Sequence, residues 1–269
     1  TDKIIKLMVG RELTNRFPPK SNTPGKEIMN VKNLSGAYSN VKDVSFSLRE
    51  GEILGIAGLA GAGRSELLET IFGIAKKKSG TVTVHGRRAD NRSSRQAIQN
   101  GFALLTEERR ATGIFGILDI IANTTISNLK NYRSGGIFLS SSKMKSDTMW
   151  AVRSMKIKTP SLKTKIRTLS GGNQQKVVIA RWLTGNSKLF IFDQPTTGVD
   201  VSAKVEIYRQ MVSLAKQGAG ILFISSEFEE LMGMCDRILV MSKGQICKEF
   251  LRGEATEKDL LYYATGADS

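Results

Sequence analysis

Short apolar runs alternate with amphipathic segments along most of the chain. In the first 106 residues, the runs typical of strands are EIMNVKNL, VKDVSFSL, GEILGIAGL, TVTV and FALLT. GEILGIAGL is nearly continuous, as expected for a strand that is buried on both faces. Nearer the C-terminus, amphipathic segments over 171–183, 203–216 and 227–234 predict helices, and the strand-like runs KLFIF, GILFIS and RILVMS lie between and after them. This alternation predicts an α/β fold with a mostly parallel core sheet.

The segment GLAGAGRS follows the most apolar strand and precedes a helix predicted over Glu66–Phe72. It matches the phosphate-binding pattern G-x-x-x-x-G-K-[ST] at Gly58, Gly63 and Ser65, but Arg64 replaces the lysine. Backbone N–H groups at such a helix start face phosphate oxygens, and the helix dipole adds positive potential. We therefore expect phosphate binding in an altered form, because arginine is bulkier than lysine and planar.

A second candidate element is the strand KLFIF followed by DQPTTGVD. Asp193 at the carboxyl end of this strand is suited to hold Mg²⁺. Gln194 follows it, and an amide cannot accept a proton from an attacking water as a carboxylate can. Together with the glycine-rich loop, this strand indicates a nucleotide site.

Net charge and composition limit the class of protein. The chain has 269 residues, 40% of them hydrophobic, and a formal net charge of +15. Ten Lys or Arg and a single acid lie between Lys130 and Arg167, in a segment over 119–167 that we expect to be mainly helical. This charge suits solvated helix faces, nucleic acid or an anionic membrane surface. With a single histidine and two cysteines, the sequence does not favour a transition-metal site.

The string LSGGNQQK, Leu169 to Lys176, resembles the signature motif of ABC (ATP-binding cassette) ATPases. Its Ser170 followed by two glycines predicts a second anion-binding helix start. The strings GEILGIAGLAGAGRSEL, TEERRATGI, LSGGNQQKVVIARWL and GVDVSAKVEIY are similar to the second cassette of tandem sugar-import ATPases, of the galactose/methyl galactoside and ribose type. The strings NLKNY and KMKSDT favour the galactoside member of this group.

The resemblance implies the P-loop ABC ATPase fold, with an antiparallel β subdomain and a helical subdomain beside the core sheet. It also implies a division of the chain into three segments. Residues 1–26 would be a linker and the tail of a preceding cassette. Residues 27–250 would be the ATPase domain, with a helical subdomain at about 108–168, and 251–269 a C-terminal helical tail. Three of the five prolines lie in the linker segment.

The resemblance also implies roles for individual residues, with ATP and Mg²⁺ as cofactors. The nucleotide-binding residues would be Tyr38 (stacking on adenine), Gly58, Gly61, Ala62, Gly63, Arg64, Ser65 and Glu66. The signature residues, acting on a partner's ATP, would be Ser170, Gly171, Gly172 and Gln174. The catalytic positions would hold Asp193, Gln194, Ser226, Glu107 and Asp200, with Ser65 and Asp193 holding Mg²⁺.

Four of these positions depart from the family's usual residues: Arg64 for Lys, Glu107 for Gln, Gln194 for Glu and Ser226 for His. They predict a degenerate site that binds nucleotide with little turnover, in a cassette that completes the partner cassette's site. For Gln194 alone, a substitution made to trap ATP is an open alternative.

The partners implied are the preceding cassette, transmembrane permease subunits and, through the complex, a periplasmic or lipoprotein sugar-binding protein, at the cytoplasmic face of the membrane. No nucleic acid is expected. The alternative is an ABC-type ATPase of nucleic-acid maintenance or ribosome binding.

Overall fold

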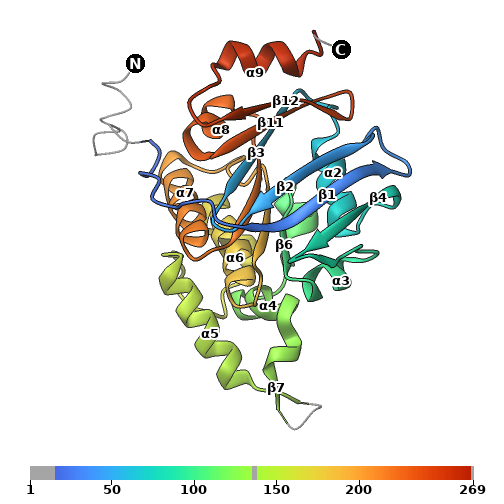
Figure 1. The fold of residues 1–269 in the computed structure, drawn as a ribbon. Coiled ribbons are helices and arrows are strands. Elements are labelled where there is room, and N and C mark those ends of the chain that lie inside the picture. The colour runs from blue at the N-terminus through green and yellow to red at the C-terminus, as the bar shows by residue number, and fades with distance from the viewer. Residues whose placement is uncertain (1–15, 135–137, 268–269) are drawn as a thin grey trace, which may run out of the picture.

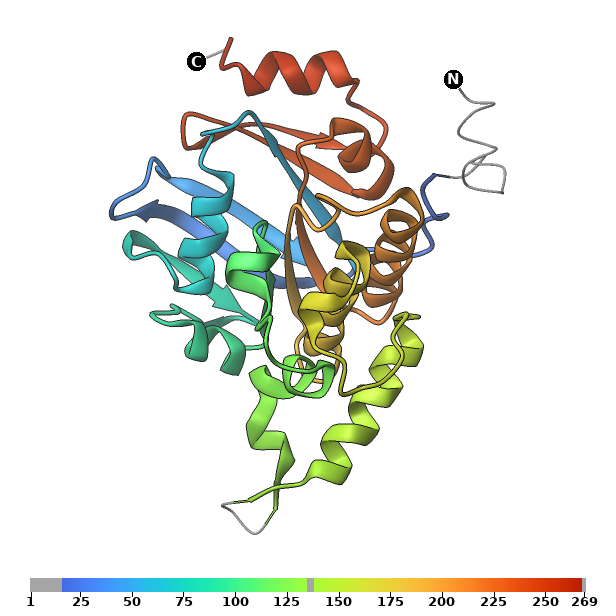
Figure 2. The ribbon, with the colours of Figure 1, turned by 180° about the vertical axis from the view of Figure 1, so that it is seen from behind.

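The computed structural model describes residues 16–134 and 138–267 (Figures 1 and 2). The tail assigned to a preceding cassette falls mostly on residues 1–15, outside the described residues. The rest of the predicted linker lies along the folded body of the chain. Arg16 forms ion pairs with Glu227 and Glu229, and Lys20 forms one with Asp236.

Within the described residues, the central sheet has six strands in the order β12-β11-β3-β10-β9-β6. All neighbouring pairs are parallel except β11 and β12. The strands are β3 (Ile53–Gly58), β6 (Phe102–Leu105), β9 (Leu189–Asp193), β10 (Gly220–Ile224), β11 (Arg237–Ser242) and β12 (Gln245–Leu251). Every residue of β3, β9 and β10 is buried, as their continuous apolar runs predict. The mostly parallel α/β core is thus confirmed.

An antiparallel sheet in the order β2-β1-β4-β5 lies beside the core (Figure 1). Its strands are β1 (Glu27–Gly36), β2 (Val44–Arg49), β4 (Lys77–Val84) and β5 (Arg87–Arg88). In β2, Val44, Phe46 and Leu48 are buried and alternate with more exposed residues, which is the pattern of a sheet with one face on the core.

The middle of the chain forms a separate helical part at the lower end of the molecule in Figure 1. It holds α4 (Ile120–Thr125), the 3-10 helices Ile126–Tyr132 and Ile166–Thr168, and α5 (Ser141–Ser154). Helix α6 (Gly171–Leu183) lies nearer the middle of the molecule in that view and contacts α4 and α5 as well as α7 and β6. This middle segment also contains a short antiparallel ladder, which the sequence pattern did not predict, between β7 (Arg133–Ser134) and β8 (Phe138–Leu139). Two-residue strands leave no periodicity for a sequence pattern to reveal.

The other helices cover the sheets. Among the described residues, the α-helices that do so are α2 (Arg64–Phe72), α3 (Ser94–Gln99), α7 (Val201–Lys216), α8 (Phe228–Met234) and α9 (Glu257–Ala264), and a π-helix, Arg109–Gly113, follows β6. Helices α2, α7, α8 and α9 all contact β3, the strand that leads into the glycine-rich loop. Among the described residues, no helix is long and apolar enough to cross a membrane.

Candidate functional site: a phosphate loop, an acidic strand end and a separate signature helix

The glycine-rich loop connects buried β3 to α2, as the sequence predicts. Gly63 caps α2 with φ of 94°, in the left-handed region that favours glycine. A Cβ atom at Gly61 would meet no other atom within 4 Å, so the loop is open above its backbone. The first intrahelical bond runs from Leu67 N to Gly63 O, 2.9 Å. The preceding N–H groups, at Arg64, Ser65 and Glu66, are thus at the helix start where an anion can be bound.

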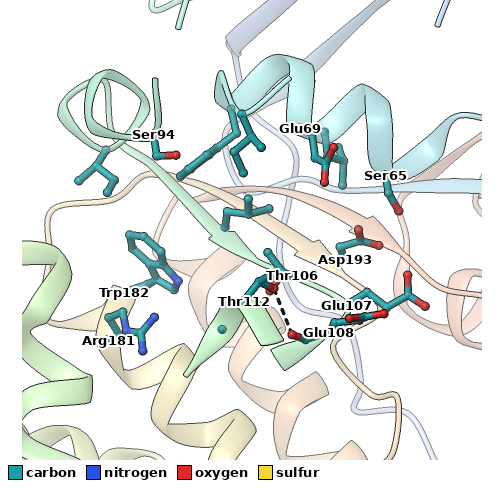
Figure 3. A pocket seen from close by; sticks show the side chains of 16 residues that line it. Ser65, Glu69, Ser94, Thr106, Glu107, Glu108, Thr112, Arg181, Trp182 and Asp193 are labelled. Carbon is teal, nitrogen blue, oxygen red and sulfur yellow. Dashed lines mark hydrogen bonds between the residues drawn. The ribbon is translucent and has the colours of Figure 1, made fainter. Parts of the chain in front are cut away.

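Ser65 and Asp193 lie together beside this loop (Figure 3). Asp193 is the last residue of β9 and is 7% exposed. Burial raises the pKa of its carboxyl to about 6; the nearby Glu107 carboxylate adds to this, while a hydrogen bond from Ser65 and the charge of Arg64 oppose it. Among the described residues, Asp193 Oδ1 has no hydrogen-bond partner. A buried carboxylate oxygen without a partner beside a serine hydroxyl fits Mg²⁺, which prefers hard oxygen ligands.

Arg64 extends from the start of α2 to the end of β10. Its Nη1 donates to the carbonyl oxygen of Ser225, 3.2 Å away. Burial lowers the pKa of the guanidinium, and the carboxylates of Asp193, Glu107 and Glu66 oppose this. The structure thus brings three predicted positions, 64, 107 and 193, into one electrostatic cluster.

Gln194 and Ser226 occupy the two loops that follow β9 and β10. Gln194 has φ of 46°, and its N–H donates to Ile224 O, 3.0 Å away, at the end of β10. Its Oε1 accepts a hydrogen bond from Thr197 Oγ1 at 3.4 Å. Ser226 is exposed, whereas the preceding Ser225 is buried. The chain therefore places Ser225, which the sequence did not single out, against Arg64.

Tyr38 lies in the loop after β1 and is 88% exposed. Two residues later, Asn40 Nδ2 donates to the Gly61 carbonyl, 3.0 Å away, and ties this loop to the glycine-rich loop. An exposed aromatic ring next to the glycine-rich loop is available to stack on a base.

A cavity of about 450 Å³ extends from Ser65 and Asp193 toward the helical part of the chain (Figure 3). Its far end holds Arg181 and Trp182, which the sequence reading did not identify. Arg181 Nε donates to Asn123 O, 2.7 Å away, and burial lowers its pKa to about 10. The sequence signal for Arg181 was an arginine among the apolar residues VVIARWL of the helix predicted over 171–183, because arginine is rarely buried without a partner. Within the described residues, Trp182 Nε1 has no hydrogen-bond partner.

The signature segment lies at the start of α6. Ser170 is the N-cap residue, and its Oγ accepts from Asn173 N at 3.5 Å and from Asn173 Nδ2 at 2.9 Å. A Cβ atom at Gly172 would lie 2.7 Å from Cβ of Ala203, so Gly172 allows α6 to pack closely on α7. Asp200 caps α7 by accepting from Ala203 N at 3.0 Å.

The four predicted signature residues differ in exposure. Ser170 is exposed and Gly171 is half-buried, whereas Gln174 is 3% exposed. Gln174 Nε2 donates to the carbonyls of Ile166 and Leu169, at 3.3 and 3.1 Å, within its own chain. The Gln174 side chain therefore fixes the segment that precedes α6. Solvent reaches the helix start at the exposed Ser170 and the half-buried Gly171, whereas Gly172 is buried.

Comparisons with known proteins identify the family and the fold of this chain. The model of the family described as "ABC transporter" matches residues 41–197, so the chain belongs to the ABC transporter family. Two proteins named galactose/methyl galactoside import ATP-binding protein MglA are close in sequence. The one from Pasteurella multocida is 52% identical over 264 residues, and the one from Escherichia coli K12 is 51% identical over 265. In each case the match spans 98% of this chain but 52% of the relative, so the chain spans about half the length of these relatives.

Solved structures support the fold. A nucleotide-free ATP-binding cassette from an ABC transporter superposes with a TM-score of 0.76 at 22% identity, covering 88% of this chain and 99% of that one. The ATP-binding cassette MJ0796 bound to ADP and Pi gives 0.71 at 21% identity, covering 83% and 98%. The sequence relatives named above are import ATP-binding proteins, so the alternative of nucleic-acid maintenance or ribosome binding is not favoured.

Proposed function

We propose that this chain is an ATP-binding cassette of a sugar importer, with galactose or a methyl galactoside as the cargo of the complete transporter. The names and the identity of the relatives support this cargo. The tandem arrangement, with this chain as the second cassette, rests on the sequence resemblance and on the share of the relatives' length that it spans. Its partners would then be a first cassette, membrane permease subunits and a sugar-binding protein, at the cytoplasmic face of the membrane.

The pocket of this chain would bind ATP and Mg²⁺ but hydrolyse slowly. Gln194 follows Asp193 at the mouth of the site and cannot accept a proton from an attacking water. Ser226 offers a hydroxyl where an imidazole would supply a titratable group. Backbone N–H groups of the loop would bind phosphates, Ser65 and Asp193 would hold Mg²⁺, and Arg64 would add positive charge. Bound Mg²⁺ would neutralise phosphate charge.

The signature helix would serve a second site. The start of α6 is capped by Ser170 and packs against the loop before α7, through Gly171 and Gly172. A helix start with exposed Ser170 and half-buried Gly171 can present N–H groups to the γ-phosphate of a nucleotide held by another cassette. The observation that carries the proposal is this combination: a signature helix that keeps Ser170, Gly171 and Gly172, and a pocket that lacks a base at Gln194.

The test compares ATP hydrolysis by this chain alone, by the matching first cassette alone, and by the two together. We expect little turnover by this chain alone and a marked increase when both are present. Robust turnover by this chain alone would contradict the degenerate site. Equal rates for the first cassette with and without this chain would contradict the composite site.

A further inference from the structure

Glu230 is a fully buried carboxylate that receives hydrogen bonds from four side chains. It lies on α8 and is 0% exposed. The donors are Thr196 Oγ1 at 2.8 Å, Ser225 Oγ at 2.7 Å, Tyr208 OH at 2.6 Å and Lys204 Nζ at 3.0 Å. Burial alone would raise the pKa of Glu230, but these bonds lower it overall, so the group is a carboxylate at neutral pH.

These four side chains come from three separate parts of the chain. Lys204 and Tyr208 lie on α7, and they bond to Oε1. Thr196, two residues after Gln194, and Ser225, at the end of β10, bond to Oε2. One oxygen thus anchors the helix, and the other anchors the two loops that border the nucleotide pocket.

Ser225 connects this carboxylate to the glycine-rich loop. Its hydroxyl donates to Glu230, and accepts from Glu227 N at 3.0 Å, which fixes the turn after β10. The carbonyl of the same residue accepts from Arg64 Nη1. Arg64 is therefore held by an acceptor whose own position depends on a buried carboxylate.

A structural role alone would also account for a buried carboxylate with four donors, since removing it would leave buried donors without an acceptor. Because Ser225 contacts both Glu230 and Arg64, a purely structural role and a role in the pocket predict different dependence on Arg64. If Glu230 only stabilises the fold, its loss affects ATP affinity in the same way whatever residue stands at 64. If Glu230 acts on the pocket, its effect depends on Arg64.

We propose that Glu230 is a positioning residue of the nucleotide pocket, which acts through Ser225 on Arg64. This rests on the proposed function, namely that the pocket binds ATP. One terminal nitrogen of the guanidinium is held by the Ser225 carbonyl, and the guanidinium also interacts electrostatically with the carboxylates of Asp193 and Glu107. A side chain held in one orientation loses less freedom when phosphate binds, so the tether raises affinity.

The experiment is a double-mutant cycle in this chain, with ATP–Mg²⁺ binding measured by titration calorimetry. Ser225→Ala removes the hydroxyl that bonds to Glu230 and keeps the backbone carbonyl. We expect it to weaken binding about threefold to tenfold, the usual range for one hydrogen bond. In an Arg64→Ala background the same change should alter affinity by less than about twofold, because the residue that Ser225 holds is absent.

Glu230→Gln is the second variant, since an amide keeps the shape but cannot accept from all four donors. Its matched control is Glu229→Gln, because Glu229 is an exposed neighbour that forms an ion pair with Arg16. We expect the first to weaken binding only when Arg64 is present, and the second to leave it unchanged. Thermal unfolding of each variant verifies that it is folded.

The outcomes separate this inference from the proposed function. If the folded wild-type chain binds no ATP at millimolar concentration, both are wrong. If the wild type binds ATP and Ser225→Ala weakens binding by the same factor with Arg64 and with Ala at 64, only the positioning role is wrong. A loss that vanishes in the Arg64→Ala background supports both.

Discussion

A Cβ atom placed on Gly171 would lie 2.5 Å from Nη2 of Arg109, so the arginine side chain covers one side of the signature helix start. Arg109 Nη1 donates to Thr197 O at 2.8 Å, and Nη2 donates to Gly198 O at 3.1 Å. The arginine thereby joins the segment after β6 to the loop before α7, directly beside Gly171. A larger residue at 171 would displace this arrangement as well as obstruct an approaching nucleotide.

In the proposed tandem protein, with a first cassette and membrane subunits present, we predict that Gly171→Asp lowers the steady-state ATPase activity by at least about tenfold. The new side chain would block phosphate from the helix N–H groups and add repulsive charge. Arg64→Ala should lower the activity much less, because in the proposed function it affects only the pocket that hydrolyses slowly.

The control for this prediction is Gly116→Asp, where a Cβ atom would have room, 3.7 Å from the nearest atom, Cβ of Arg167. It should retain most of the activity. If Arg64→Ala proves more damaging than Gly171→Asp, the pocket of this chain is the working one and the asymmetric mechanism is wrong.

Ser65→Ala should weaken ATP binding about threefold to tenfold in the presence of Mg²⁺. When the metal is chelated, the substitution should have little effect, because the Ser65 hydroxyl is a metal ligand in the proposed site. Titration calorimetry with and without chelator measures this. Ser94→Ala, at another part of the same cavity wall, is the matched control and should bind as the wild type does (Figure 3). An effect of Ser65→Ala that is independent of Mg²⁺ would argue against the assigned role.

The buried Asp193 predicts a pH dependence of stability. Its pKa is about 6 in the folded chain, and roughly 3.9 is expected in the unfolded chain. Between these two values the folded state binds more protons, so the free energy of unfolding falls as pH rises from 4 to 6. The full contribution of this one carboxyl is about 3 kcal/mol. Asp193→Asn should remove that part of the pH dependence, as measured by urea unfolding at both ends of the window. An identical pH dependence in the variant would show that other groups are responsible.

Gln194→Glu should raise the ATPase rate of this chain by less than about tenfold, short of the 10²–10⁴ that a well-placed general base supplies. The new carboxylate would occupy the same backbone position, but Arg64 and Ser226 would still depart from the usual family residues. Single-turnover hydrolysis by the variant and the wild type measures the difference. A hundredfold recovery would mean that Gln194 alone limits the site, as in a substitution made to trap ATP.

The sequence by itself determined the elements whose chemistry is local. The glycine-rich loop, the Asp193 strand end and the Ser170 helix start follow from residues that are neighbours in the chain, where glycine conformation and helix capping act over a few positions. The parallel core followed from alternating strands and helices, because a buried strand is recognisable by its continuous apolar run. By contrast, the edge strand β12 is mostly exposed and gave no such run.

Only the tertiary structure decided which side chains meet. Arg64 donates a hydrogen bond to Ser225, 161 positions away in the chain. Glu230 accepts hydrogen bonds from α7 and from two loops. The tertiary structure likewise determines that Gln174 bonds to the Ile166 carbonyl of its own chain and that Arg109 lies beside Gly171. These contacts depend on which strands are neighbours in the sheet and on how α6 packs against α7. Hydrophobic periodicity records which face of an element is buried, but not the residue that lies opposite, so the polar partners appear only when the elements are packed.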